Sequence, residues 1–145
     1  MQAMQPSREL LILREKVQRF LEKDVDEFRI VDDRYEVAYQ QTRVAIHPID
    51  WTTQRTLLRV LAPIVIDVKP SPQLYERLSE LNNTTIFGKY YVLENTIYIE
   101  HNLLGESLDR EAFRATLASV AHHADHLVPA LIAEFGGHTW SQHDG

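Results

Sequence analysis

Apolar residues recur every three or four positions in three stretches of the chain, and this spacing predicts three amphipathic helices. The first covers about 7–23 and the second about 71–83, where Ser71 provides an N-cap and is followed by a proline. The third covers about 107–136 and carries the longest apolar stripe. Pro129 falls on the polar side of that stripe, so we expect it to bend the helix without removing a core side chain.

Between the helices, apolar and polar residues alternate with a period of two, which predicts strands. A first hairpin joins 28–31 to 35–39, and a third strand covers 43–47, followed by a connection at 48–52. The apolar segment 57–68 is rich in β-branched residues, so we expect a bent strand rather than a helix, with Pro63 at a bulge or at an edge position.

A second hairpin covers 85–102, with Glu94 and Asn95 as a two-residue loop, because asparagine tolerates positive φ. This loop sets the register, which pairs Val92 with Ile97, Tyr91 with Tyr98, Tyr90 with Ile99 and Lys89 with Glu100. The apolar face, expected in the core, carries Ile86, Gly88, Tyr90, Val92, Ile97 and Ile99. The opposite face, our candidate protein- or peptide-binding site, carries Phe87, Lys89, Tyr91, Tyr98 and Glu100.

These elements follow the order α-β-β-β-β-α-β-β-α, which predicts an α+β two-layer sandwich. We expect an antiparallel sheet with the helices on one face. The 145 residues suit one domain at 7–137, with a disordered N-terminus at 1–6 and a flexible tail at 138–145. The exposed aromatic residues on the other sheet face have two readings. They form a partner site, for a peptide or for a second copy in a homodimer, or they only stabilise the sheet.

Composition narrows the function further. The chain has no cysteine, which excludes disulfides and thiolate metal sites and fits a cytoplasmic protein. The formal net charge of −6 argues against nucleic-acid binding, and no stretch approaches the ~20 apolar residues of a membrane span. We therefore expect a protein or peptide partner, with no nucleic acid and no membrane.

One histidine cluster suggests chemistry. His122 and His126 lie four residues apart on one helical face, so they are candidate metal ligands and support an alternative function as a metal or pH sensor. A metal site needs a third ligand, and the competing reading is a solvated helix face. His101 reads as a partly buried residue rather than a catalytic base. No arrangement of residues predicts catalysis or a cofactor, so we expect a protein that is not an enzyme.

Several motifs resemble a known family. They are LAPIVIDV at 61–68, SPQLYERLSELN at 71–82, FGK at 87–89, LLGE at 103–106, and a long helix ending in FGG at 135–137. Together they resemble the YbjN-like domains and the related type III secretion chaperones typified by CesT. The resemblance implies an α+β fold, often dimeric, with no enzymatic chemistry. It also implies a chaperone-like or regulatory protein that holds a segment of a client, and YbjN relatives are described as sensory-transduction regulators.

Overall fold

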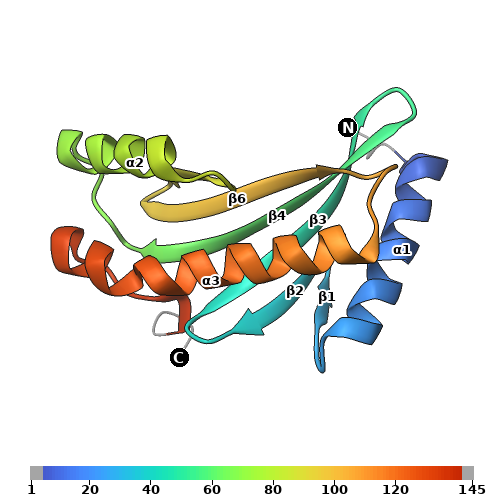
Figure 1. Cartoon of the computed structure of the whole chain (residues 1–145), viewed down its shortest axis with the longest axis horizontal. Helices are drawn as coiled ribbons and strands as arrows, with labels where there is room; N and C mark the ends of the chain where they lie inside the picture. The colour runs from blue at the N-terminus through green and yellow to red at the C-terminus, as the bar shows by residue number, and fades with distance from the viewer. Residues whose placement is uncertain (1–4, 142–145) are drawn as a thin grey trace.

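The structure, a computed structural model, describes residues 5–141 and contains three helices and a six-stranded sheet within that range (Figure 1). The elements are α1 (Arg8–Asp24), β1 (Arg29–Val31), β2 (Arg34–Tyr39), β3 (Thr42–Thr52), β4 (Arg55–Ile66), α2 (Pro72–Thr84), β5 (Lys89–Leu93), β6 (Thr96–Leu104) and α3 (Arg110–Phe135). Their order matches the order predicted from the sequence, and the α+β fold class is confirmed.

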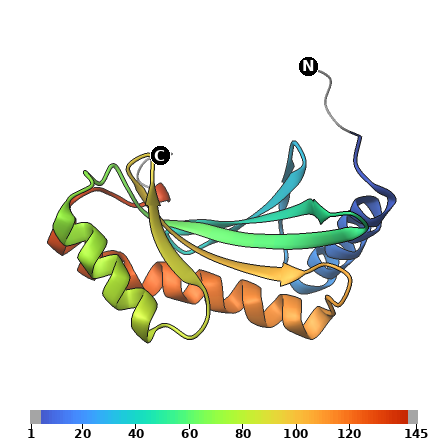
Figure 2. The ribbon, with the colours of Figure 1, turned by 90° about the horizontal axis from the view of Figure 1, so that it is seen from above.

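The strands pair antiparallel throughout, in the order β1-β2-β3-β4-β6-β5. β4 is therefore central and lies between β3 and β6, although α2 and β5 separate it from β6 along the chain. Figure 2 shows the helices on one side of the sheet, while the outer hairpins rise on the other side. The sheet is thus covered on one face only, as predicted.

Strict alternation along the strands puts the core on the helix side. Every second residue is buried over 42–48 of β3 and 56–64 of β4, including Val44 and Ile46, as the period-two pattern predicts. Leu13, Val17 and Leu21 of α1 and Phe113 of α3 join the same hydrophobic cluster. Most of the apolar side chains lie on the helix side of the sheet, so the opposite face must be stabilised by other interactions.

A side-chain cap marks the beginning of each helix. The side chains of Ser7, Ser71 and Asp109 each accept a hydrogen bond from a backbone N–H in the first turn of the helix that follows. Pro129 lies within α3 and is exposed, on the side predicted for it. Pro63 lies at an irregularity in the β4–β6 pairing, and β4 is not an edge strand, so of the two predicted alternatives the structure shows the bulge.

The predicted connection at 48–52 was wrong, because β3 continues to Thr52 and turns at Thr53 and Gln54. Pro48 misled the prediction, since a proline cannot donate a ladder hydrogen bond. The pairing of β2 with β3 ends at Ile46, so Pro48 lies where β3 is paired on one side only. A proline is tolerated in such a place.

The tail expected to be flexible from 138 is anchored over 138–141. Ile66 and His138 exchange two backbone hydrogen bonds, and the Ser141 N–H donates to the Gln41 carbonyl. Figure 2 shows this segment passing from the helix side to the uncovered side of the sheet. Residues 142–145, and residues 1–4 of the predicted disordered N-terminus, lie outside the described part of the chain.

The two edges of the sheet differ. At the β5 edge, the Asn82 side chain of α2 donates to the Tyr90 carbonyl at 2.9 Å and accepts from the Tyr90 N–H at 2.7 Å. This amide occupies backbone groups that would otherwise pair with another strand. At the other edge β1 pairs with β2 only as far as Glu36, so the outer side of the end of β2 has no strand beside it in the described chain.

Replacing Asn82 by alanine should lower the free energy of unfolding by about 1–2 kcal/mol, because two hydrogen bonds to Tyr90 are lost together. Chemical denaturation measures this. Asn83→Ala, one residue further along the same helix and also exposed, is the matched control and should change stability by much less. Equal effects of the two substitutions would contradict a specific role for Asn82.

Candidate functional site

The uncovered face of the sheet is hollowed into a groove of about 680 Å³, which we call the open-face groove. Its lining comes from five strands and from the C-terminal segment. The lining residues are Arg34, Glu36, Arg43, Ala45, His47, Arg59, Leu61, Pro63, Ile66, Tyr91, Leu93, Thr96, Tyr98, Glu100 and Trp140. A surface assembled from so many strands exists only in the folded sheet.

The strand register determines how the groove is built. Paired residues form a row across five strands, in the order Glu36, Ala45, Leu61, Glu100 and Lys89. The middle of the row is small and apolar, and a carboxylate lies on each side of it. The groove therefore has an apolar floor at its centre with charged groups on both flanks.

Glu100 is the most heavily bonded side chain of the groove. Its carboxylate accepts hydrogen bonds from the Tyr91 hydroxyl at 2.8 Å and from the Asn102 amide at 3.0 Å. Lys89 Nζ and Arg59 Nε lie 3.5 and 3.6 Å from Oε2. Burial alone raises the pKa of Glu100, but these hydrogen bonds and charges outweigh burial and hold its pKa below the ordinary value. Glu100 is thus ionised, and its negative charge is balanced by Lys89 and Arg59.

On the opposite flank of the groove, Glu36 is a second buried carboxylate with two cationic partners. Arg34 Nε and Arg43 Nη1 each donate to its carboxylate at 3.2 Å, and Glu36 itself is buried. The Arg43 guanidinium also lies 5.1 Å from the centre of the Trp140 ring, within the range of a cation–π contact. The C-terminal segment is held against the groove in this way, and Trp140 becomes part of its wall.

Tyr91 and Tyr98 form the aromatic part of the groove. Their rings stack across β5 and β6 with centroids 5.5 Å apart, in the pairing predicted from the hairpin loop. Burial, and then the hydrogen bond to Glu100, raise the pKa of the Tyr91 phenol, so it remains a hydrogen-bond donor. Both rings are only partly buried, which leaves a flat apolar surface for contact.

Four of the five residues predicted for this face, Lys89, Tyr91, Tyr98 and Glu100, are brought together. Phe87 is not with them, and its predicted place on this face was wrong. Its ring stacks on His101 at 3.8 Å, and His101 follows the core-facing Ile97 and Ile99 in alternation.

The reason lies in the next residue, Gly88, which has a φ of +95°. The strand β5 begins only at Lys89, so the alternation does not extend through this left-handed glycine to Phe87. His101 is itself half-buried, as predicted, and burial lowers its pKa.

The prediction also missed the residues that other strands bring to the groove. The groove is not the bare aromatic surface expected, because Arg34, Glu36, Arg43 and Arg59 are among its lining residues. A period-two reading of 34–39 already places Arg34 and Glu36 on one face. No local signal indicated that they lie in the same groove as Glu100, or that Trp140 folds back to join them.

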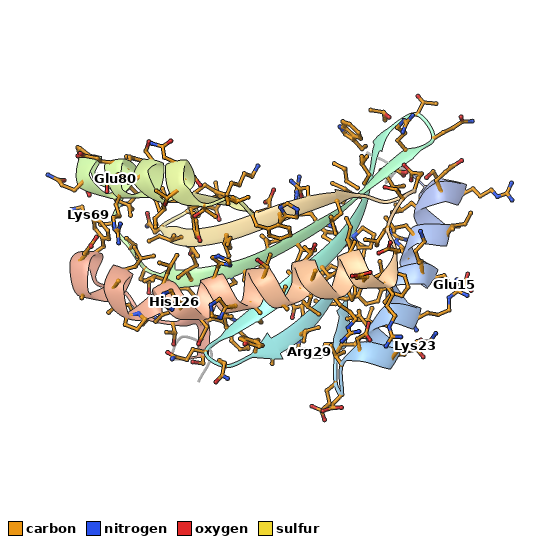
Figure 3. The ribbon with its side chains drawn as sticks, viewed as in Figure 1. Glu15, Lys23, Arg29, Lys69, Glu80 and His126 are labelled. Carbon is orange, nitrogen blue, oxygen red and sulfur yellow. The ribbon has the colours of Figure 1, made fainter. Side chains whose placement is uncertain are left out.

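The histidines of α3 lie elsewhere. His122 and His126 are exposed, their rings stack at 5.7 Å, and His126 projects from the outer side of α3 (Figure 3). Within residues 5–141, no three His, Asp or Glu side chains are grouped closely enough to hold a metal ion. Nothing in residues 5–141 supports the alternative function as a metal or pH sensor. None of the described helices has the length and apolarity needed to cross a membrane.

An antiparallel sheet with three helices on one face and a groove on the other makes this an α+β protein with one sheet face left open. Comparison with known families specifies the class. Residues 12–143 match the family described as "T3SS (YopN, CesT) and YbjN peptide-binding chaperone 1". The match covers most of the chain, so this protein belongs to that family of peptide-binding chaperones, which confirms the resemblance found in the sequence.

A solved structure shares the fold. A chain of the structure described as "Crystal Structure of the ExsC-ExsE Complex" aligns with a TM-score of 0.62 and 17% identity, covering 85% of this chain and 95% of that one. At this identity the likeness concerns the fold alone. Among curated proteins, none matches this sequence.

Replacing Glu100 by glutamine should lower the free energy of unfolding by about 2 kcal/mol at pH 7, because Lys89 and Arg59 lose their counter-charge. The folded-state pKa is depressed, so the charge stabilises fully above the ordinary value of 4.5 and progressively less as the pH falls through the folded-state value. The gap between the wild type and Glu100→Gln should therefore close in acid. Denaturation at several pH values measures it, and a gap that stays constant down to pH 3 would contradict this prediction.

Proposed function

We propose that this protein is a cytoplasmic, non-enzymatic chaperone-like protein that holds an extended segment of a client across the open-face groove. The observation that carries the proposal is a hollow of about 680 Å³ on a sheet face that no helix covers. Membership of a peptide-binding chaperone family supports it. The ExsC-ExsE complex is a complex of a protein with the same fold, which is consistent with a protein client here.

The groove has what such a role requires. The apolar floor at Ala45 and Leu61 and the stacked rings of Tyr91 and Tyr98 offer surface for client side chains without demanding one sequence. The flanking ion pairs keep this face soluble while it is empty. Binding of this kind needs no reacting group, and we assign no residue of the groove a catalytic role.

A second copy of the chain is the other occupant that an uncovered sheet face accepts. Sedimentation with and without a bound client peptide distinguishes the two occupants. A dimer that dissociates as the peptide binds would show that the copy uses the groove. A peptide that binds without a change in mass would show that any self-association uses another surface.

Replacing Tyr91 and Tyr98 together by alanine should weaken client binding by at least ten-fold, since stacked aromatic surface at an interface commonly contributes more than about 1.4 kcal/mol. The client is first captured from lysate of the native host, and overlapping synthetic peptides of it are then titrated by fluorescence anisotropy. Tyr75→Ala is the matched control, because Tyr75 is 56% exposed on α2, away from the groove. Thermal unfolding of each variant separates lost binding from lost folding. Unchanged affinity in the double variant would remove the groove from the function.

A further inference from the structure

An incoming ligand meets cations in the open-face groove, not carboxylates. The side chains of Glu36 and Glu100 are only 5% and 7% exposed. The cations around them are far more accessible, with side-chain exposures of 35% for Arg34, 34% for Arg43, 41% for Arg59 and 60% for Lys89. The carboxylates are covered and neutralised by their partners, while parts of all four cations remain accessible to a ligand.

The balance of charge points the same way. Four cations surround two carboxylates in and beside the groove, and His47, also in its lining, lies 3.4 Å from the exposed Asp33. The groove therefore carries excess positive charge in a chain whose formal net charge is −6. An acidic ligand is disfavoured over the rest of the surface and attracted to this face.

Arg59 has unused bonding capacity. Its Nε is shielded from solvent and makes no hydrogen bond within the described residues. Glu100 Oε2 lies 3.6 Å away, close enough for an ion pair but too far for a hydrogen bond. The Arg59 side chain as a whole is 41% exposed, so a ligand carboxylate would meet this guanidinium, in the central strand of the sheet, from the solvent side and not through the shielded Nε.

We propose that the groove selects an extended client segment that carries acidic side chains. This inference rests on the proposed function and adds the chemistry of the client. The four cations come from β2, β3, β4 and β5, with β6 between the last two. With strands about 4.8 Å apart, the distance from β2 to β5 is about 19 Å, which about six extended residues cover. Two or more Asp or Glu residues on one side of that segment would meet the cations, while apolar residues meet Leu61, Tyr91 and Tyr98.

The test is a selection from a random twelve-residue peptide display library on the immobilised full-length protein, with an uncoated surface as background. Asp and Glu should be enriched among the recovered sequences. The best acidic peptide, resynthesised with a fluorophore, should lose about ten-fold in affinity for the variant Arg34→Gln with Arg59→Gln, the equivalent of about 1.4 kcal/mol. Its affinity for the wild type should also fall steeply as salt is raised.

Two further variants isolate the charge. Arg34→Lys with Arg59→Lys keeps both charges and should retain most of the affinity. Arg8→Gln with Arg19→Gln removes two exposed arginines from α1 and should leave the affinity unchanged. Circular dichroism and thermal unfolding show that each variant is folded. Arg34 and Arg59 also neutralise Glu36 and Glu100, so the Gln pair disturbs both buried carboxylates. Lys89→Gln, at the most exposed cation, leaves both partners of Glu36 and the Arg59–Glu100 pair in place, and this second measurement should show a few-fold lower affinity.

The possible outcomes separate the two proposals. Enrichment of apolar peptides without acidic residues, bound equally by the wild type and the Gln pair, would overturn the acidic client and leave the peptide-binding function standing. Peptides enriched in lysine and arginine would do the same. A selection that recovers nothing above background would count against both proposals.

Discussion

The open-face groove depends on the neutralisation of two buried carboxylates. A carboxylate that leaves water without a partner destabilises the fold by several kcal/mol, so Glu36 and Glu100 are tolerated on the sheet only because each lies between two cations. These cations belong to four different strands, and the ion pairs therefore join strands as well as charges. They stabilise a sheet face that neither a helix nor an apolar layer covers, and this is what leaves room for a ligand.

The sequence predicted those parts of the fold that short-range rules determine. The loop at Glu94 and Asn95, both at positive φ, fixed the whole register of β5 and β6. Side-chain caps marked where the helices begin, and Pro63 marked a bulge because its missing donor must be accommodated. Each of these features involves residues within a few positions of one another, so the pattern along the chain is sufficient to find it.

The rest was not predictable because it depends on contacts between distant segments. Alternation assigned Phe87 to the wrong face, since nothing in the letters Phe-Gly-Lys reveals that Gly88 adopts a φ of +95°. Pro48 suggested a loop, and only the early end of the β2–β3 pairing makes it acceptable in a strand. The charged character of the groove requires β4 to lie beside β6, a neighbour that is not next along the chain.

The unequal edges of the sheet limit how copies of this protein can join. Growth of an open-ended fibre by strand pairing needs two complementary edges on every copy, so that each unit offers one and accepts one. Here the Asn82 amide occupies the Tyr90 position of β5, whereas beyond Glu36 the outer side of β2 has no strand beside it in the described chain. A strand that pairs along β5 must displace this amide from Tyr90, which disfavours that edge relative to the β1–β2 edge. One asparagine on a neighbouring helix thereby works against open-ended growth through both edges.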